Sequence, residues 1–284
     1  MSQRCVLSMM PPKQKGEIIR SLNVKDYFRY SCNSAILACR EVQCVISEGQ
    51  NRIDEKISNL QTDSFRDHAS EELKSCLNVL QSFSARLLAW HQDVEGESRL
   101  IIETIRPFIQ YCINSQIDAK SEWMTYHLVP AEEHPGQATL VPDFVIYADP
   151  RSNMKHELLF MESSFGKEMQ IALNKLVLEG VSSPEVVGLL VEGVHVCMYK
   201  MNLPYDGQYH LVQLSEFNLP RNGNDDLLLI PTVVENLHQL RRIVSKNLDK
   251  LYDSISMKEQ GSSQVSDQQQ FMRQSCGTPV IVKK

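Results

Sequence analysis

Hydrophobic residues follow two different spacings along the chain. In the N-terminal third they recur every three or four positions, which predicts a helical stretch over residues 24–57, broken near Gly49, and a helix from about Ser70. In the middle they form short runs bounded by turn residues, which predicts strands. From Glu97 onward the predicted order is helix, strand, strand, strand, helix and strand, at residues 97–112, 123–128, 141–147, 157–162, 166–179 and 186–191.

The pattern continues with tight turns at 192–193 and 206–207, which predict two more strands over 195–203 and 209–214. An apolar stripe then predicts a last helix from about Thr232. We expect helices beginning at Glu97 and Gly166 to cover the two faces of the sheet, and the helices before Trp90 to form a separable unit. The expected parts are a flexible leader, a helical N-terminal region, an α/β domain and a disordered tail rich in Ser and Gln, at 1–22, 23–95, 96–256 and 257–284.

Two apolar runs within residues 141–162 predict a β-hairpin, and each run carries one carboxylate, Asp143 or Glu162. Two acids on neighbouring strands can hold a hard divalent cation. Alternatively, Asp143 begins its strand with its side chain in solvent, and Glu162 caps the helix that follows. Glu97 lies in the first turn of the third predicted helix, where it either joins the two acids or complements the helix dipole. Pro107 predicts a kink or a break later in that helix.

The composition narrows the class of protein. The chain has 284 residues, of which 42% are apolar, so it can bury a sizeable core. Its 29 basic and 35 acidic residues give a net charge of −6, which argues against a surface coated for nucleic acid but leaves room for a local basic cleft. Eight cysteines without a Cys-x-x-Cys pair indicate free thiols in a reducing compartment.

The sequence also argues against several locations and chemistries. It shows neither a signal peptide nor an apolar run of membrane-spanning length, so we expect an intracellular protein, cytoplasmic or nuclear, without a membrane partner. It lacks a phosphate-binding glycine loop, an H-E-x-x-H motif and a G-x-S-x-G elbow. We interpret His195 and His210, on alternating predicted strands, as sheet residues rather than metal ligands.

The element order, with Pro142 and Asp143 on the second strand and Glu162 on the third, resembles the PD-(D/E)XK nuclease superfamily, which has the restriction-endonuclease-like fold. The resemblance implies an αβββαβ core, here with an added β-hairpin and a C-terminal helix, preceded by a helical N-terminal region. It covers roughly residues 97–253. A more specific likeness is to uncharacterised fungal proteins with a divergent core of this type, through the segments 187–203 and 214–220.

The resemblance implies a catalytic metal site. In the superfamily, the acids that match Asp143 and Glu162 hold Mg²⁺ or Mn²⁺, and Glu97 is a weaker match for a further ligand. The ion activates a water and stabilises the leaving oxygen of a DNA or RNA phosphodiester. The family pattern also places a lysine two residues after the glutamate, where this chain has Ser164.

Three other lysines lie nearby in the sequence, Lys155, Lys167 and Lys175. Lys167, at the start of the helix after Glu162, is the best placed to take the catalytic position, although the run between these two residues is short beside the family pattern. Because the motif lysine is missing, we expect a retained fold with weakened or lost catalysis at least as much as an intact active site.

Two functions from different classes therefore remain open. The first is a divergent metal-dependent nuclease or nuclease relative that acts on DNA or RNA. The second is a non-catalytic module that keeps the fold and binds nucleic acid or protein. An amine within hydrogen-bond reach of Asp143 and Glu162 favours the first, and its absence favours the second. The N-terminal helices and the last helix each offer an apolar face through which the chain could pair with a second copy of itself.

Overall fold

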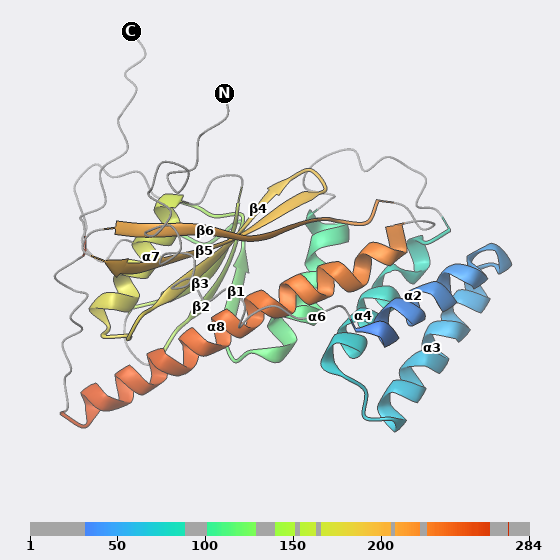
Figure 1. The fold of residues 1–284 in the computed structure, drawn as a ribbon, viewed down its shortest axis with the longest axis horizontal. Coiled ribbons are helices and arrows are strands. Elements are labelled where there is room, and N and C mark those ends of the chain that lie inside the picture. Colours follow the sequence, from blue (N-terminus) through green and yellow to red (C-terminus); the bar gives the residue numbers. More distant parts are fainter. Residues whose placement is uncertain are drawn as a thin grey trace, which may run out of the picture. The chain divides into compact units, whose positions relative to one another are not determined.

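The computed structural model describes residues 32–88, 101–128, 140–150, 154–162, 166–205, 208–221, 226–261 and 272. These residues form a mixed α/β structure around one six-stranded sheet (Figure 1). The α-helices are α2 (Asn33–Val45), α3 (Gln50–Arg66), α4 (Glu71–Phe83), α6 (Arg106–Cys112), α7 (Gly166–Leu178) and α8 (Ile230–Glu259). The strands are β1 (Lys120–Trp123), β2 (Phe144–Ala148), β3 (His156–Glu162), β4 (Glu185–Glu192), β5 (His195–Tyr205) and β6 (Gln208–Asn218).

Short helical segments connect several of these elements. They are η3 (Ile46–Glu48), η4 (Ser84–Arg86), the π-helical η5 (Ile101–Ile105), η6 (Asn114–Gln116) and η7 (Asp226–Leu229). The predicted leader, 1–22, lies outside the described residues. So does most of the predicted tail, although α8 continues to Glu259, three residues beyond the expected boundary at 256.

Local signals set the ends of the N-terminal helices. α3 begins after Gly49, whose φ of 100° lies in the region that favours glycine. α4 begins after Ser70, whose hydroxyl accepts a hydrogen bond from the N–H of Leu73 at 3.3 Å and so satisfies one of the free amides of the first turn. The predicted break near Gly49 and the predicted helix start near Ser70 are confirmed.

The third predicted helix is divided at its proline. A π-helical segment, η5, precedes α6, and Pro107 lies in the first turn of α6. Proline is tolerated there because the N–H that it lacks has no partner within the helix at that position. The segment stays helical here and changes from π- to α-helix next to the proline, so the proline marks a change of helix type rather than an end of the helix. Glu97 lies outside the described residues.

The sheet follows the order of the strands in the chain, β1 to β6. The pairs β1–β2 and β2–β3 are antiparallel, β3–β4 is parallel and is connected through α7, and β4, β5 and β6 form an antiparallel meander. The first strand differs from the one predicted over 123–128. It ends at Trp123 because Met124 takes a positive φ of 55°, and beyond it Leu128 makes only an isolated bridge to Leu140.

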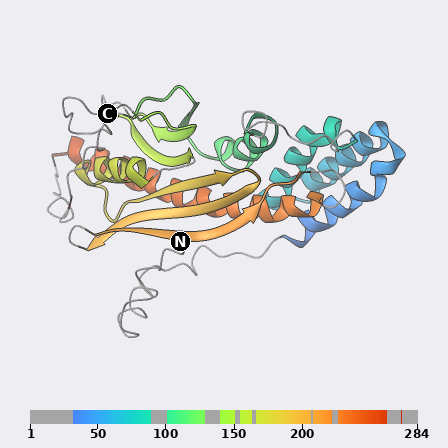
Figure 2. The ribbon, with the colours of Figure 1, turned by 90° about the horizontal axis from the view of Figure 1, so that it is seen from above.

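Helices cover both faces of the sheet, as both apolar central runs predict. α7 packs against β3, β4 and β5, and α8 packs against β3, β4 and β6 from the opposite side (Figures 1 and 2). The prediction of two covered faces is confirmed, but the expectation that the helix near Glu97 forms the second layer is wrong. α6 packs on α4 and α8 instead, because α8, with 30 residues, is long enough to cover the sheet and still reach the helices.

α8 also joins the N-terminal helices to the sheet. α2, α4 and α6 all pack on it, and Ser75 of α4 hydrogen-bonds His238 of α8 at 3.0 Å. The hydroxyl of Ser75 in turn donates to the carbonyl of Tyr111 in α6 at 3.0 Å. The predicted helices of the N-terminal region are present, and the described ones belong to the same compact unit as the sheet, 31–284.

One buried side chain tests the docking of α8 on the sheet. The carbonyl oxygen of the Asn247 amide accepts from the backbone N–H of Glu185 at 2.8 Å, and its nitrogen donates to the carbonyl of Ile243 at 2.7 Å. Because Asn247 is fully buried, Asn247→Ala leaves the amide of Glu185 without a partner. We expect the free energy of unfolding to fall by about 1–3 kcal/mol, measured by urea denaturation. Asn236→Ala, on the partly exposed part of the same helix, should lower the free energy of unfolding by less. Equal decreases for the two variants would contradict the role given to the buried Asn247 amide.

Candidate metal centre at the ends of β2 and β3

The hairpin register places the two predicted acids at the same end of their strands. Phe144 pairs with Met161, so Asp143 and Glu162 are the next residues outward on β2 and β3. The backbone at Asp143 is fixed to the neighbouring strand, because its carbonyl accepts from the N–H of Met124 at 2.9 Å. The prediction that both acids flank paired strands is confirmed.

A third carboxylate belongs to the same cluster. Glu168 lies in the first turn of α7, the helix that follows β3, and it is buried. Its charge and that of Asp143 both act on Glu162. Glu168 was not among the predicted site residues, although an acid in the first turn of the helix after Glu162 is visible in the sequence.

The electrostatics of this cluster disfavour three negative charges. Burial is the main cause that raises the pKa of Glu162, and the charges of Glu168 and Asp143 raise it further, to about 7. Burial also raises the pKa of Glu168. Within the described part of the chain, the buried Oε2 atom of Glu162 has no hydrogen-bond partner. A cation is the kind of ligand that would satisfy this oxygen and offset the repulsion.

Two of the three candidate lysines are held elsewhere. Lys155 directly precedes the first residue of β3. Its ammonium contacts Glu122 at 3.5 Å and lies over the rings of Tyr126 and Tyr147. Glu162 is the last residue of that strand, about 20 Å away at the rise of an extended chain. Lys155 is therefore too distant to replace the motif lysine.

Lys175 is likewise committed to a different partner. Its ammonium donates to both carboxylate oxygens of Glu157, at 2.7 and 3.0 Å. Glu157 lies five residues before Glu162, about 16 Å along the strand. Lys167 is partly exposed in the first turn of α7, where its charge opposes in part the burial that raises the pKa of the adjacent Glu168. Ser164 lies outside the described residues.

The arrangement suits a hard cation bound by oxygen. Mg²⁺ in proteins is usually bound through one or two carboxylates and keeps several waters, so Asp143 and Glu162 would suffice. The ligand atoms of Asp143, Glu162 and Glu168 do not all lie close together. In the described part of the chain, three ligand atoms within 4.8 Å of one another occur at His195, Cys197 and Glu216 instead.

Comparisons of the chain with protein-family models, with curated proteins and with solved structures found no match. Among the described residues, none of the helices is both long and apolar enough to span a membrane.

Proposed function

We propose that Asp143 and Glu162 bind a divalent metal ion, Mg²⁺ or Mn²⁺, and that the chain is a divergent nuclease-like protein that acts on DNA or RNA phosphodiesters. The observation that carries this proposal is the carboxylate of Glu162. It is partly buried, one of its oxygens has no partner among the described residues, and two other acids act on it. A bound cation lowers the free energy of such a group by favouring its charged form.

The order of elements supports the same class. Three antiparallel strands, a helix and a strand parallel to the third follow one another as β1, β2, β3, α7 and β4, with α6 before them in the chain. This is the αβββαβ order that the PD-(D/E)XK resemblance implies. The assignment to the restriction-endonuclease-like fold rests on this order together with the position of Asp143 and Glu162 at one end of the hairpin.

Each residue of the cluster has a distinct part in the proposed site. Asp143 and Glu162 supply oxygen ligands from two paired strands, so their backbones are rigidly placed. Glu168 adds negative charge from α7, which strengthens the attraction for a cation. When bound, such an ion activates a water and stabilises the leaving oxygen of a phosphodiester. Lys167 is the remaining candidate for positioning the substrate.

A second function is favoured by the missing lysine. Ser164 occupies the motif position in the sequence, and Lys155 and Lys175 are held far from Glu162 by other partners. A chain that keeps the fold without this amine would bind nucleic acid or protein without cleaving it. Pairing with a second copy through the N-terminal helices or α8 remains a prediction.

A cleavage assay separates the two functions. We expect the purified chain to cut plasmid DNA, single-stranded DNA or RNA in the presence of Mg²⁺ or Mn²⁺, and EDTA to abolish cutting. Asp143→Ala and Glu162→Ala should each reduce the rate by at least about a hundredfold, since ligand loss removes the ion's contribution to the transition state. Lys167→Ala tests whether this lysine contributes.

Asp149→Ala is the matched control. Asp149 follows the other end of β2 and pairs with Lys120 at 2.6 Å on the surface, so its loss should leave cutting unchanged. Metal binding and nucleic-acid binding without cleavage would support the non-catalytic function. If the chain shows no metal binding and no cleavage with either ion, the proposed metal site is overturned.

A further inference from the structure

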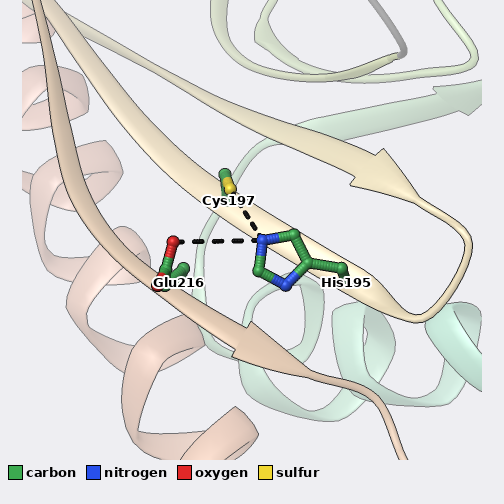
Figure 3. A group of neighbouring side chains, drawn as sticks. All are labelled: His195, Cys197 and Glu216. Atoms are coloured by element: carbon green, nitrogen blue, oxygen red, sulfur yellow. Dashed lines mark hydrogen bonds and ion pairs between the residues drawn. The ribbon is translucent and has the colours of Figure 1, made fainter. Parts of the chain in front are cut away.

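A second group of ligand-type side chains lies on the β5–β6 hairpin. His195 and Cys197 are on β5, two residues apart and therefore on one face of the strand. Glu216 on β6 pairs in register with Cys197, which places it on the same face. Figure 3 shows the three side chains close together, with dashed lines from one ring nitrogen of His195 to the sulfur of Cys197 and to an oxygen of Glu216.

The distances suit a single metal ion. Nε2 of His195 lies 3.3 Å from the sulfur of Cys197 and 3.9 Å from a carboxylate oxygen of Glu216, and all three ligand atoms lie within 4.8 Å of one another. Ligands at the usual zinc bond lengths around a tetrahedral ion are about 3.4–3.6 Å apart. Only Glu216 must move inward, and because its side chain is 63% exposed it has room to do so.

Neighbouring amides orient two of the three ligands. Nδ1 of His195 lies 3.4 Å from the amide oxygen of Asn218, the residue with which His195 pairs across the hairpin. With Nδ1 as the donor, Nε2 presents its lone pair to the group. The amide nitrogen of Gln213 donates to a carboxylate oxygen of Glu216 at 3.2 Å. Outer partners of this kind are typical of metal ligands, because they fix the tautomer and the ring orientation.

We propose that His195, Cys197 and Glu216 form a Zn²⁺ site. One nitrogen, one sulfur and one oxygen ligand suit this borderline-soft ion and are a poor set for Mg²⁺, which prefers oxygen alone. Three protein ligands leave a fourth position open to water or to a small ligand. His195 and Glu216 are both partly exposed, so that position faces solvent.

Binding of zinc at this site releases a proton. A cysteine binds a metal only as the thiolate, so the thiol of Cys197 must lose its proton when zinc binds. Zinc binds the thiolate and displaces the S–H proton to solvent, which makes the affinity rise with pH.

The zinc site is separate from the acid cluster. Leu190 of β4 pairs with Glu162 on one side and with Cys197 on the other, so Glu162 and Cys197 lie in one row on one face, two strands apart. Two strand spacings amount to about 10 Å, whereas paired catalytic ions lie about 3.5–4 Å apart. The two sites therefore share no ligand and do not form a paired-ion centre.

Titration with Zn²⁺ and Co²⁺ tests the site on the full chain. We expect one equivalent of Zn²⁺ to bind by calorimetry, with proton release, and Co²⁺ to give a thiolate-to-metal charge-transfer absorption that Zn²⁺ abolishes. Cys197→Ser should remove that absorption. His195→Ala and Glu216→Gln should each weaken Zn²⁺ binding by at least about tenfold, and Asn218→Ala by about 10–100-fold through His195.

Matched controls separate this site from other thiols and imidazoles. Cys44→Ser removes an exposed cysteine of α2, and His210→Ala removes a histidine from another part of β6, so both should leave the absorption and the affinity unchanged. The proposal is overturned if Co²⁺ gives no thiolate absorption, or if Cys197→Ser binds Zn²⁺ as tightly as the natural chain. Asp143→Ala and Glu162→Ala should keep full Zn²⁺ affinity, so failure of one site does not imply failure of the other.

Discussion

Replacing Lys175 by methionine should lower the free energy of unfolding by about 3–5 kcal/mol, because it leaves the buried carboxylate of Glu157 without its counter-ion. The side chains of Lys175 and Glu157 are 4% and 0% exposed, so water cannot take the place of the ammonium. Glu157 also accepts a hydrogen bond from the hydroxyl of Tyr126, which alone cannot neutralise the charge. Chemical denaturation at neutral pH measures the loss.

Removing both partners should cost much less than removing one. Lys175→Met combined with Glu157→Leu fills the same space with apolar groups and leaves no buried charge, so most of the lost stability should return. The hydroxyl of Tyr126 then lacks its acceptor, and adding Tyr126→Phe should recover a further part.

A surface ion pair provides the comparison. Lys120 and Asp149 are 2.6 Å apart, but their side chains are 60% and 34% exposed. Lys120→Met should therefore have little effect on the free energy of unfolding. If Lys175→Met is no more harmful than Lys120→Met, then the Lys175–Glu157 pair is solvated in solution and does not anchor α7 to β3.

Hydrophobic spacing predicts most of the elements because each one buries a face with its own period. The fully buried β2 and residues 158–161 of β3 are continuous apolar runs, and α7 carries its apolar face at helical spacing. Gly49 and Ser70 mark helix ends because their roles are local. The strands on either side of the predicted turns, β2 and β3, β4 and β5, and β5 and β6, pair with each other because each turn is short.

Tertiary choices are harder to read from the sequence. The helix near Glu97 and α8 both carry apolar faces, and nothing local decides which one covers the sheet. β1 ends at Trp123 because Met124 takes a positive φ. A methionine in the sequence gives no sign of such a backbone conformation. The sequence offers Lys175 as a replacement for the motif lysine, and only packing shows that Glu157, 18 residues earlier, holds it.

The sequence predicts more of one candidate site than of the other. Asp143 and Glu162 were predictable because a proline, two apolar runs and the hairpin between them are local signals. Glu168 is visible in the sequence as an acid in the first turn of the helix after Glu162, but only the folded structure shows that its charge acts on Glu162. The group at His195 likewise depends on contacts between strands. A His-x-Cys pair on a predicted strand puts both side chains on one face, which is the signal that could have drawn attention to His195 and Cys197. The register that adds Glu216 appears only in the folded sheet.

At pH 8 without metal, Glu162→Gln should be more stable than the natural chain by on the order of 1–2 kcal/mol, a figure discounted because Glu162 is only partly buried. Folding raises the pKa of Glu162 from the ordinary 4.5 to about 7, so the folded state binds its proton more tightly than the unfolded state. The carboxylate therefore adds no penalty below about pH 4.5, and the penalty grows as the pH rises to 7 and is then constant. Thermal or urea unfolding between pH 4 and pH 8 should show the gap opening over that window.

Magnesium should reverse the order of the two proteins. An ion that binds only the folded state adds about 2.7 kcal/mol when its free concentration is a hundredfold above Kd, which exceeds the advantage of Glu162→Gln. At pH 8 with Mg²⁺ the natural chain should thus become the more stable, while Glu162→Gln and Asp143→Ala gain little. Protons compete with the ion for Glu162, so the gain should be smaller at pH 6 than at pH 8. Asp149→Asn should respond to Mg²⁺ like the natural chain. If Mg²⁺ and Mn²⁺ stabilise Glu162→Gln as much as the natural chain, any bound ion lies away from Asp143 and Glu162, and the nuclease-like site loses its main support.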